Sequence, residues 1–571
     1  MKPAKGQLTA RGIVIGCIGC AIITAASAYT ALKMGALPWP IIFAAIISLF
    51  FLKALGKTSL NEANVTHTIM SAGAMVAGGL AFTIPGIWII TKANSVDWWE
   101  MLIVALSGVI LGLICTVFMR KYFIEDAKLE FPIGEAAAQT LKAGDAGGKV
   151  GKQLFGSMAL AGIYTALRDW FAVIPAMLLG NISIPGVAFG IYNSPMLLAV
   201  GFLVGTASVV VWFIGALIGN FGIIVGGSGL GLWDIATGQG ITSSLGMGVM
   251  MGCGIGVILK NILPKAIQMI KNGATSGSAT FELTATGARK SDASTQAKRR
   301  RMRLTAGLIA GGIAAVALLI CIGLGLGPLP SIIIVLFAWI TTAMSAQSVG
   351  QTGIDPMEIF GLIVLLIVAA VSNIPQVQLF FVAGIIAVAC GLAGDVMNDF
   401  KAGHVLGTDP KAQWIGQAIG GVLGAFVAVA VMFILVQAYG ADAFGLGGSF
   451  VSAQASVVAT MVTGIPSIPS FIIGLVVGCG LYLLGLPVMM LGLGIYLPFY
   501  MSFTAFLGAM AKVVYDQICK RRRAKLSPEE AEAKEKAQGE SGLIVASGLL
   551  GGESIVGVLV AFASVAMGLG L

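Results

Sequence analysis

The sequence predicts an all-α polytopic membrane protein of about 14 to 16 transmembrane helices, in two repeated halves with broken or re-entrant segments. Of its 571 residues, 57% are hydrophobic and only 10% are charged, whereas a soluble protein carries about 25% charged residues. Apolar runs of roughly 18 or more residues, long enough to cross a bilayer, recur along the whole chain. Many of the 79 glycines fall inside these runs, where small residues let helices approach closely or break.

The first half contains a series of apolar runs separated by short polar turns. The predicted spans are Gly12 to Leu32, Leu37 to Leu55, Asn61 to Pro85, Met101 to Met119, Leu154 to Leu179, Met196 to Leu217 and Gly240 to Leu263. Before Leu154, a break at Phe131-Pro132 precedes a short helix that places Glu135 near its positive end. The glycine-rich stretch Gly219 to Asp234 predicts a broken or re-entrant segment.

The second half repeats this organisation after a polar linker. Its predicted spans are Leu304 to Leu326, Pro328 to Ser345, Glu358 to Ser372, Leu379 to Val396, Ala412 to Val436, Phe471 to Leu484, a pair broken by Pro487 and Pro498, and Gly542 to Leu571. Weak similarities in the same order, such as GALPWPII with GPLPSIII, favour an ancient duplication. We therefore divide the chain into a first membrane repeat (1–263), a cytoplasmic basic linker (264–303), a second membrane repeat (304–511), a charged loop (512–540) and a final helix (541–571).

The net charge of +9 comes from basic residues in short loops, not from a soluble domain. Such residues mark the cytoplasmic side of a membrane protein, and nucleic acid is not an expected partner. Lys53 and Lys57 place the end of the second helix in the cytoplasm, so the N-terminus is also cytoplasmic. The first apolar run is long enough to span and lacks a clear cleavage site, which predicts a retained helix. The expected location is the inner (plasma) membrane.

The sequence shows no metal-ligand cluster, nucleotide-binding loop or nucleophile with a base, so we expect no enzyme, no metal and no cofactor. Its chemistry lies in ionisable residues inside apolar runs, which are costly unless they face protein or water. Arg168 and Asp169 are predicted near the middle of one helix, pointing in different directions, so each needs its own partner. Glu553 lies in the last apolar run with no cation beside it, which suits a proton carrier.

Structural roles remain open for each of these residues. Arg168 and Asp169 are compatible with an ion pair to another helix, and Glu553 with a carboxylate at a helix end. His67 can titrate near neutral pH but is also compatible with a structural hydrogen bond. Asp399 and Lys401 lie where a helix reaches the cytoplasm, and a solvated face is the alternative there.

Several stretches, in order, resemble the oligopeptide transporter family, which includes the yellow stripe-like metal-chelate transporters. They are NEANVTHTIMSAGAMVAGG, EFPIGEAAAQTLKAG, GDVMNDFKAGHVLGTDPKAQWIGQAIG, LGLGIYLPFYMSFTAFLGAM and SGLLGGESIVG. The resemblance implies a secondary transporter of about sixteen helices that imports peptides or metal chelates with protons. The family motifs carry over to Glu62, His67, Glu135, Asp399, Lys401, Tyr496 and Glu553, although the family often has glutamine where His67 stands.

The function that these observations predict is proton-coupled symport of short oligopeptides, with uptake of metal-chelate or siderophore complexes as the alternative. The expected partners are a small peptide, protons and the lipid bilayer, and a homodimer is one open arrangement. Glu62 and His67 lie near the cytoplasmic end of their helix, where we expect an inner gate or proton exit. We expect the central substrate site deeper, on the small-residue face from Ser71 to Gly79.

Overall fold

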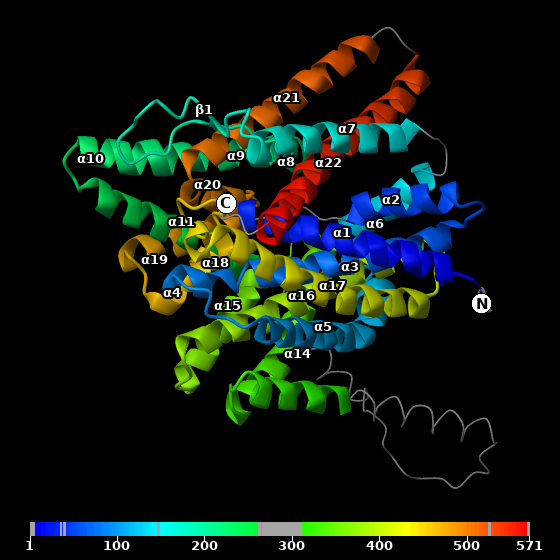
Figure 1. The fold of residues 1–571 in the computed structure, drawn as a ribbon, viewed down its shortest axis with the longest axis horizontal. Helices are drawn as coiled ribbons and strands as arrows, with labels where there is room; N and C mark the ends of the chain where they lie inside the picture. Colours follow the sequence, from blue (N-terminus) through cyan, green and yellow to red (C-terminus); the bar gives the residue numbers. More distant parts are fainter. Residues whose placement is uncertain are drawn as a thin grey trace.

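The computed structural model is built almost entirely of helices (Figure 1). It describes residues 6–34, 37, 41–144, 149–257, 259, 260, 264, 311–353, 355–523 and 527–567. Within these residues, eight helices are long and apolar enough to cross a membrane, and six further apolar helices are shorter. The prediction of an all-α polytopic membrane protein is confirmed.

The helices of the first half are α1 (Ala10–Met34), α2 (Ile41–Ala54), α3 (Leu60–Ala81), α4 (Pro85–Thr91), α5 (Trp98–Arg120) with η1 (Lys121–Asp126), α6 (Pro132–Gly144), α7 (Lys149–Thr165) with η2 (Ala166–Trp170), α8 (Pro195–Val204), α9 (Thr206–Ala216) with η3 (Leu217–Gly226), α10 (Gly227–Gly229) and α11 (Ile235–Val257). A two-stranded antiparallel hairpin, β1 (Met177–Leu178) with β2 (Ile191–Tyr192), lies between η2 and α8.

The second half has a helix over Gly311–Gly323 that ends in η5 (Leu319–Gly323). The helices that follow are α14 (Pro328–Thr352), α15 (Met357–Val371), α16 (Gln376–Leu406), α17 (Pro410–Tyr439), η6 (Ala441–Ala443), α18 (Ala453–Thr463), α19 (Ile468–Leu483), α20 (Val488–Tyr496), α21 (Phe499–Arg523) and α22 (Pro528–Ala566).

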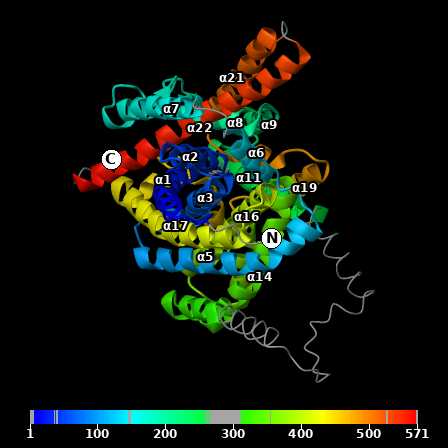
Figure 2. The same cartoon turned by 90° about the vertical axis from the view of Figure 1, so that its right-hand side faces the viewer.

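Helices α3 and α16 form the centre of the molecule. Figure 2 shows α1, α2, α16 and α17 around α3, and each of them packs against it. Glycines set these close crossings: a Cβ at Gly73 would lie 2.9 Å from the Cα of Gly424 in α17, and one at Gly79 would lie 2.7 Å from the backbone nitrogen of Val388 in α16. Small residues at such crossings let helix backbones meet, because van der Waals contact drives helix association in membranes.

Segments far apart in the sequence pair around this centre. Helix α11 packs on α19, α7 on α22, and α8 on α21. Helices α21 and α22 extend together beyond the rest of the molecule as a hairpin (Figure 1). The first and second halves therefore interlock, and helices of both halves surround α3.

Several predicted segment boundaries are wrong. The span predicted from Leu154 to Leu179 ends at Trp170, where the chain leaves a π-helical turn, and Ala172 follows with a φ of 51°. The span predicted from Met196 to Leu217 is broken at Gly205, whose φ of 98° is in the glycine-favoured region. The glycine-rich stretch after it is helical up to Gly229, partly as a π-helix, and the helix is broken between Gly229 and Ile235.

The charged stretch 512–540, predicted as a loop, is also helical on both sides of residues 524–526. Its alternating acidic, basic and alanine residues favour helix, and this accounts for the longer α22. The basic linker 264–303 lies outside the described residues, apart from Pro264. The helix predicted from Asn61 is confirmed as α3, and the predicted break at Pro498 separates α20 from α21.

Candidate functional site

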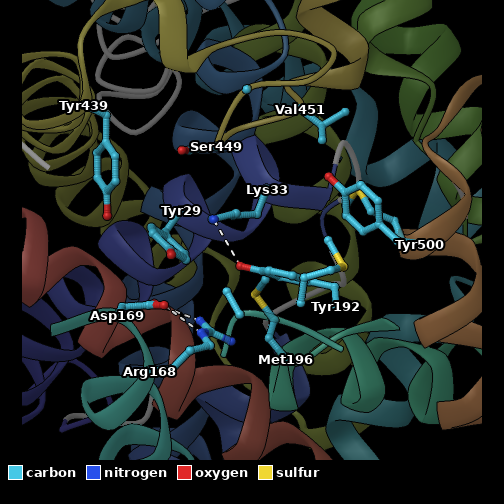
Figure 3. Close-up of a pocket in the computed structure, with 14 residues that line it drawn as sticks. Tyr29, Lys33, Arg168, Asp169, Tyr192, Met196, Tyr439, Ser449, Val451 and Tyr500 are labelled. Atoms are coloured by element: carbon cyan, nitrogen blue, oxygen red, sulfur yellow. Dashed lines mark hydrogen bonds and ion pairs between the residues drawn. The ribbon is translucent and has the colours of Figure 1, made fainter. Parts of the chain in front are cut away.

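A polar cavity of about 380 Å³ lies where the ends of several helices meet (Figure 3). Tyr29 and Lys33 reach it from the end of α1, Arg168 and Asp169 from η2, and Tyr192 from β2. The remaining lining residues come from the chain before β1 and β1 itself, from α8, the end of α17, the loop after η6 and the start of α21: Ala176, Met177, Met196, Tyr439, Gly448, Ser449, Val451, Tyr500 and Met501. We call this space the Lys33 cavity.

Local sequence signals end the helices at this point. Helix α17 stops at Gly440, which has a φ of 77°, and α21 starts after Pro498. Helix α8 begins at Pro195, and the Ser194 side chain caps it by accepting a hydrogen bond from the Leu197 N–H. Interrupted helices of this kind supply the binding sites of many secondary transporters, because their ends present free backbone groups.

Lys33 is the cation without an acidic partner in this cavity. Its Nζ donates to the Tyr192 hydroxyl at 3.2 Å, as Figure 3 shows, and lies 5.1 to 5.8 Å from the ring centres of Tyr29, Tyr192 and Phe450. Distances below about 6 Å allow cation–π attraction. No carboxylate of the described residues lies within ion-pair distance of Lys33. The charge is therefore held by aromatic rings and remains available to an anion.

Arg168, by contrast, is fully engaged. Its Nε and Nη2 donate to the Asp169 carboxylate at 2.6 and 2.8 Å, and Nη2 also donates to Glu553 at 2.8 Å. Glu553 accepts further hydrogen bonds from the Ser194 hydroxyl at 2.9 Å and from the Met196 N–H at 2.8 Å. The side chains of Arg168 and Glu553 are fully buried, whereas that of Asp169 is 23% exposed. Asp169 is thus the carboxylate that faces the cavity.

A second polar region lies inside the bundle, between α3, α16 and α17. His67 Nε2 is 2.9 Å from Asp399 Oδ1, and the Ser71 hydroxyl donates to Asp395 at 3.1 Å. The Gln417 amide donates to both aspartates, at 2.9 and 2.6 Å. We call these five residues the buried cluster. Each has a relative exposure of 0%.

The other predicted site residues lie outside both regions. Glu62 is bound by Arg11 at 2.6 Å, and also by Thr9 and Thr58, at the start of α3. Glu135 accepts from Gln139 on the surface of α6, and Lys401 donates to the Leu129 carbonyl. Tyr496 is buried at the end of α20 and does not line the Lys33 cavity. Thus His67 and Asp399 converge in one place, and Arg168, Asp169 and Glu553 in another.

Three expectations about these residues are wrong. Arg168 and Asp169 were expected to point in different directions but form an ion pair with each other, while Arg168 also pairs with Glu553 of α22, which agrees with the alternative of an ion pair to another helix. Glu553 has a cation beside it, Arg168, which comes from a distant segment. The solvated face considered for Asp399 is excluded, since its side chain is fully buried.

Neighbouring helices pack closely against the small-residue face of α3. A Cβ at Gly73 would meet the Thr24 hydroxyl, and one at Gly78 would lie 2.9 Å from Leu37. Neighbouring helices therefore fill the face from Ser71 to Gly79, where the sequence predicted the central site. The Lys33 cavity lies at the far end of α1.

Lys33 and the four tyrosines of the cavity were not predicted from the sequence. Lys33 directly follows the first apolar run, and a basic residue there is normally read as a mark of the cytoplasmic side. In the predicted topology, however, this end of the helix faces away from the cytoplasm. A basic residue on that side is an exception to the rule, and this exception could have marked Lys33 as a candidate site residue. Tyr29, Tyr192, Tyr439 and Tyr500 carry no spacing that links them before the chain is folded.

Comparison with known proteins gives a family for the whole chain. The profile of the family described as "OPT oligopeptide transporter protein" matches residues 7–564. A Haemophilus influenzae protein named "Putative oligopeptide transporter" is 24% identical over 94% of this chain and 92% of its own length. The Arabidopsis thaliana metal-nicotianamine transporter YSL3 is 33% identical over a shorter region, 17% of this chain and 14% of its own length. The chain belongs to the OPT oligopeptide transporter family, a family of membrane transporters and not of enzymes.

Proposed function

We propose that this transporter is a proton-coupled symporter of short oligopeptides in the inner (plasma) membrane, and that the Lys33 cavity holds the peptide. One observation carries the substrate assignment. Among its described residues, the cavity offers one cation without an acidic partner, Lys33, and one partly exposed carboxylate, Asp169. A peptide presents the complementary pair, a terminal carboxylate and a terminal ammonium group.

The rest of the cavity supports the same ligand. Its volume of about 380 Å³ falls within the range of about 300 to 1,000 Å³ that is usual for small-molecule sites. Tyr29, Tyr192, Tyr439 and Tyr500 supply both ring surface and hydroxyl groups, which suits side chains of varied chemistry. The hairpin of β1 and β2 contributes Tyr192 and adds backbone next to the site.

Peptide uptake into proteoliposomes tests the proposal. A labelled tripeptide is expected to accumulate when the outside is more acidic than the inside, and to stop accumulating when a protonophore removes the gradient. No uptake of any peptide from two to six residues, by protein shown to be folded, would contradict it.

Metal-chelate uptake is the second candidate, because relatives named as metal-nicotianamine transporters match part of the chain. Such chelates are rich in carboxylates, and the described part of the cavity offers them one cation without an acidic partner. Competition separates the two: iron chelates that displace the labelled tripeptide more strongly than unlabelled peptide does would favour the second candidate.

A further inference from the structure

The buried cluster is a polar island in the most enclosed part of the molecule. His67 and Ser71 lie near the middle of α3, which at 1.5 Å per residue places Ser71 about 16 Å from the start of the helix. That depth is about half of a hydrocarbon core of about 30 Å. Ionisable residues in such a place mark ion pathways and proton relays, because they are otherwise costly.

Several atoms of the cluster have no hydrogen-bond partner among the residues that the structure describes. They are both ring nitrogens of His67, one carboxylate oxygen of Asp395 (Oδ1), one of Asp399 (Oδ1) and the amide oxygen of Gln417. The 2.9 Å contact between His67 Nε2 and Asp399 Oδ1 has the distance of an ion pair but not the angle of a hydrogen bond. A buried polar atom without a partner is costly, and a proton on one of these atoms would supply a donor to its neighbour.

The groups that could bind a proton here belong to the cluster itself, because the neighbouring charged side chains that the structure describes do not interact with it. The Cys20 thiol of α1 interacts electrostatically with Asp395, and its Sγ donates to the Gly420 carbonyl. Within the described residues, the other acidic and basic side chains of α3, α6, α15 and α16 are not among its hydrogen-bond or ion-pair partners: Glu62, Glu135, Lys142, Glu358, Lys401 and His404. Asp355, before α15, accepts a hydrogen bond from the Ser345 hydroxyl instead.

Two helices connect the cluster to the Lys33 cavity. Helix α1 passes Cys20 beside the cluster and ends at the cavity with Lys33, about 20 Å further on at 1.5 Å per residue. Helix α17 carries Gln417 in the cluster and Tyr439 in the cavity. Because both helices are continuous, a change of packing around the cluster shifts helices that also line the cavity, which is a physical route for coupling between the two sites.

We propose that the buried cluster of His67, Ser71, Asp395, Asp399 and Gln417 is the site that binds the coupling proton, and that Glu553 is not. This inference rests on the proposed symport. A proton from the acidic side binds an unpartnered carboxylate oxygen or the imidazole, no other bond changes, and the same proton leaves to the opposite side. Glu553 remains bound to Arg168 and holds that residue beside the cavity.

Gradient-driven accumulation and peptide exchange, measured on the same proteoliposomes, test this site. At one proton per peptide, a gradient of one pH unit supports about tenfold accumulation of tripeptide by the wild type. Asp399→Asn and Asp395→Asn are each expected to lower the accumulation ratio to about one. Exchange of internal for external tripeptide, without a gradient, is expected to continue, because it needs no net proton movement. Asp516→Asn, on the exposed end of α21, is the matched control.

Four results of these measurements would contradict the proposal or one part of it. The proposal is wrong if Asp399→Asn and Asp395→Asn accumulate tripeptide at the wild-type ratio. It is also wrong if both variants lose exchange as well as accumulation, because that result indicates a structural role. Accumulation driven by a sodium gradient at equal pH, and lost in Asp399→Asn, overturns the assignment of the proton. If the wild type exchanges peptide but does not accumulate it, the proposed symport is wrong. If the wild type and the variants all accumulate peptide, only the role of the cluster is wrong.

Discussion

The Lys33 cavity and the buried cluster both place charge inside a helical bundle, but they do so in opposite ways. In the cavity the charged groups sit at helix ends beside an open volume, and one cation has no acidic partner. In the cluster they sit in the middle of continuous helices with no exposed surface. The cavity encloses about 380 Å³ of open volume, whereas the five residues of the cluster are packed among helices, and we propose a peptide for the first and a proton for the second.

Breaking the Arg168–Glu553 pair should have the largest effect on stability. Arg168→Ala leaves Glu553 buried without its cation, and loss of one partner of a buried ion pair costs about 3 to 5 kcal/mol. We expect a clearly lower Tm in detergent. The double variant Arg168→Met with Glu553→Met should recover part of the loss. A Tm equal to that of the wild type in the single variant would show that the pair is not a structural support of the cavity.

Removing the charge of Lys33 should weaken binding without unfolding the protein. A hydrogen bond to a charged group contributes about 1.5 to 3 kcal/mol, so Lys33→Met should raise the Kd for tripeptide about 10- to 100-fold. Isothermal titration calorimetry with detergent-solubilised protein measures this change. Lys411→Met, at an exposed position of α17, is the control. Unchanged affinity in Lys33→Met would show that the peptide does not bind in this cavity.

Adding a methyl group at the helix crossing beside the cluster should be moderately destabilising. Gly73→Ala places a Cβ within 2.9 Å of atoms from Thr24, Cys20 and Gly424, and such overpacking costs about 1 to 3 kcal/mol. A lower Tm is expected. Gly156→Ala, with no atom within 4 Å of the added carbon, should leave the Tm equal or higher. Equal Tm values for the two variants would mean that α1, α3 and α17 are packed less tightly than described.

Neutralising Glu62 should have the smallest effect. Its partner Arg11 is 34% exposed, and ion pairs with this exposure contribute about 1 kcal/mol or less. Glu62→Gln should lower the Tm slightly and leave both peptide exchange and proton-driven accumulation unchanged. Loss of accumulation in this variant would extend the proton path from the buried cluster to the start of α3.

Much of this fold could be predicted from composition and apolar run length, because both follow directly from the bilayer. His67 and Asp399 could be selected one by one, since each is an ionisable residue next to or within an apolar run. Their contact could not, because it depends on the packing of α3 against α16. The ion pairs of Arg168 with Asp169 and Glu553 could not be predicted either, because they depend on the end of one helix meeting α22, a segment far away in the sequence. Lys33 was missed because a basic residue at a helix end also serves as a topology signal.

A structure determined with bound tri-alanine tests the central division most directly. The account predicts the peptide carboxylate within hydrogen-bond distance of Lys33 Nζ, the terminal amine next to Asp169, and the buried cluster free of peptide. A peptide bound elsewhere, with Lys33 still held only by aromatic rings and Tyr192, would contradict it.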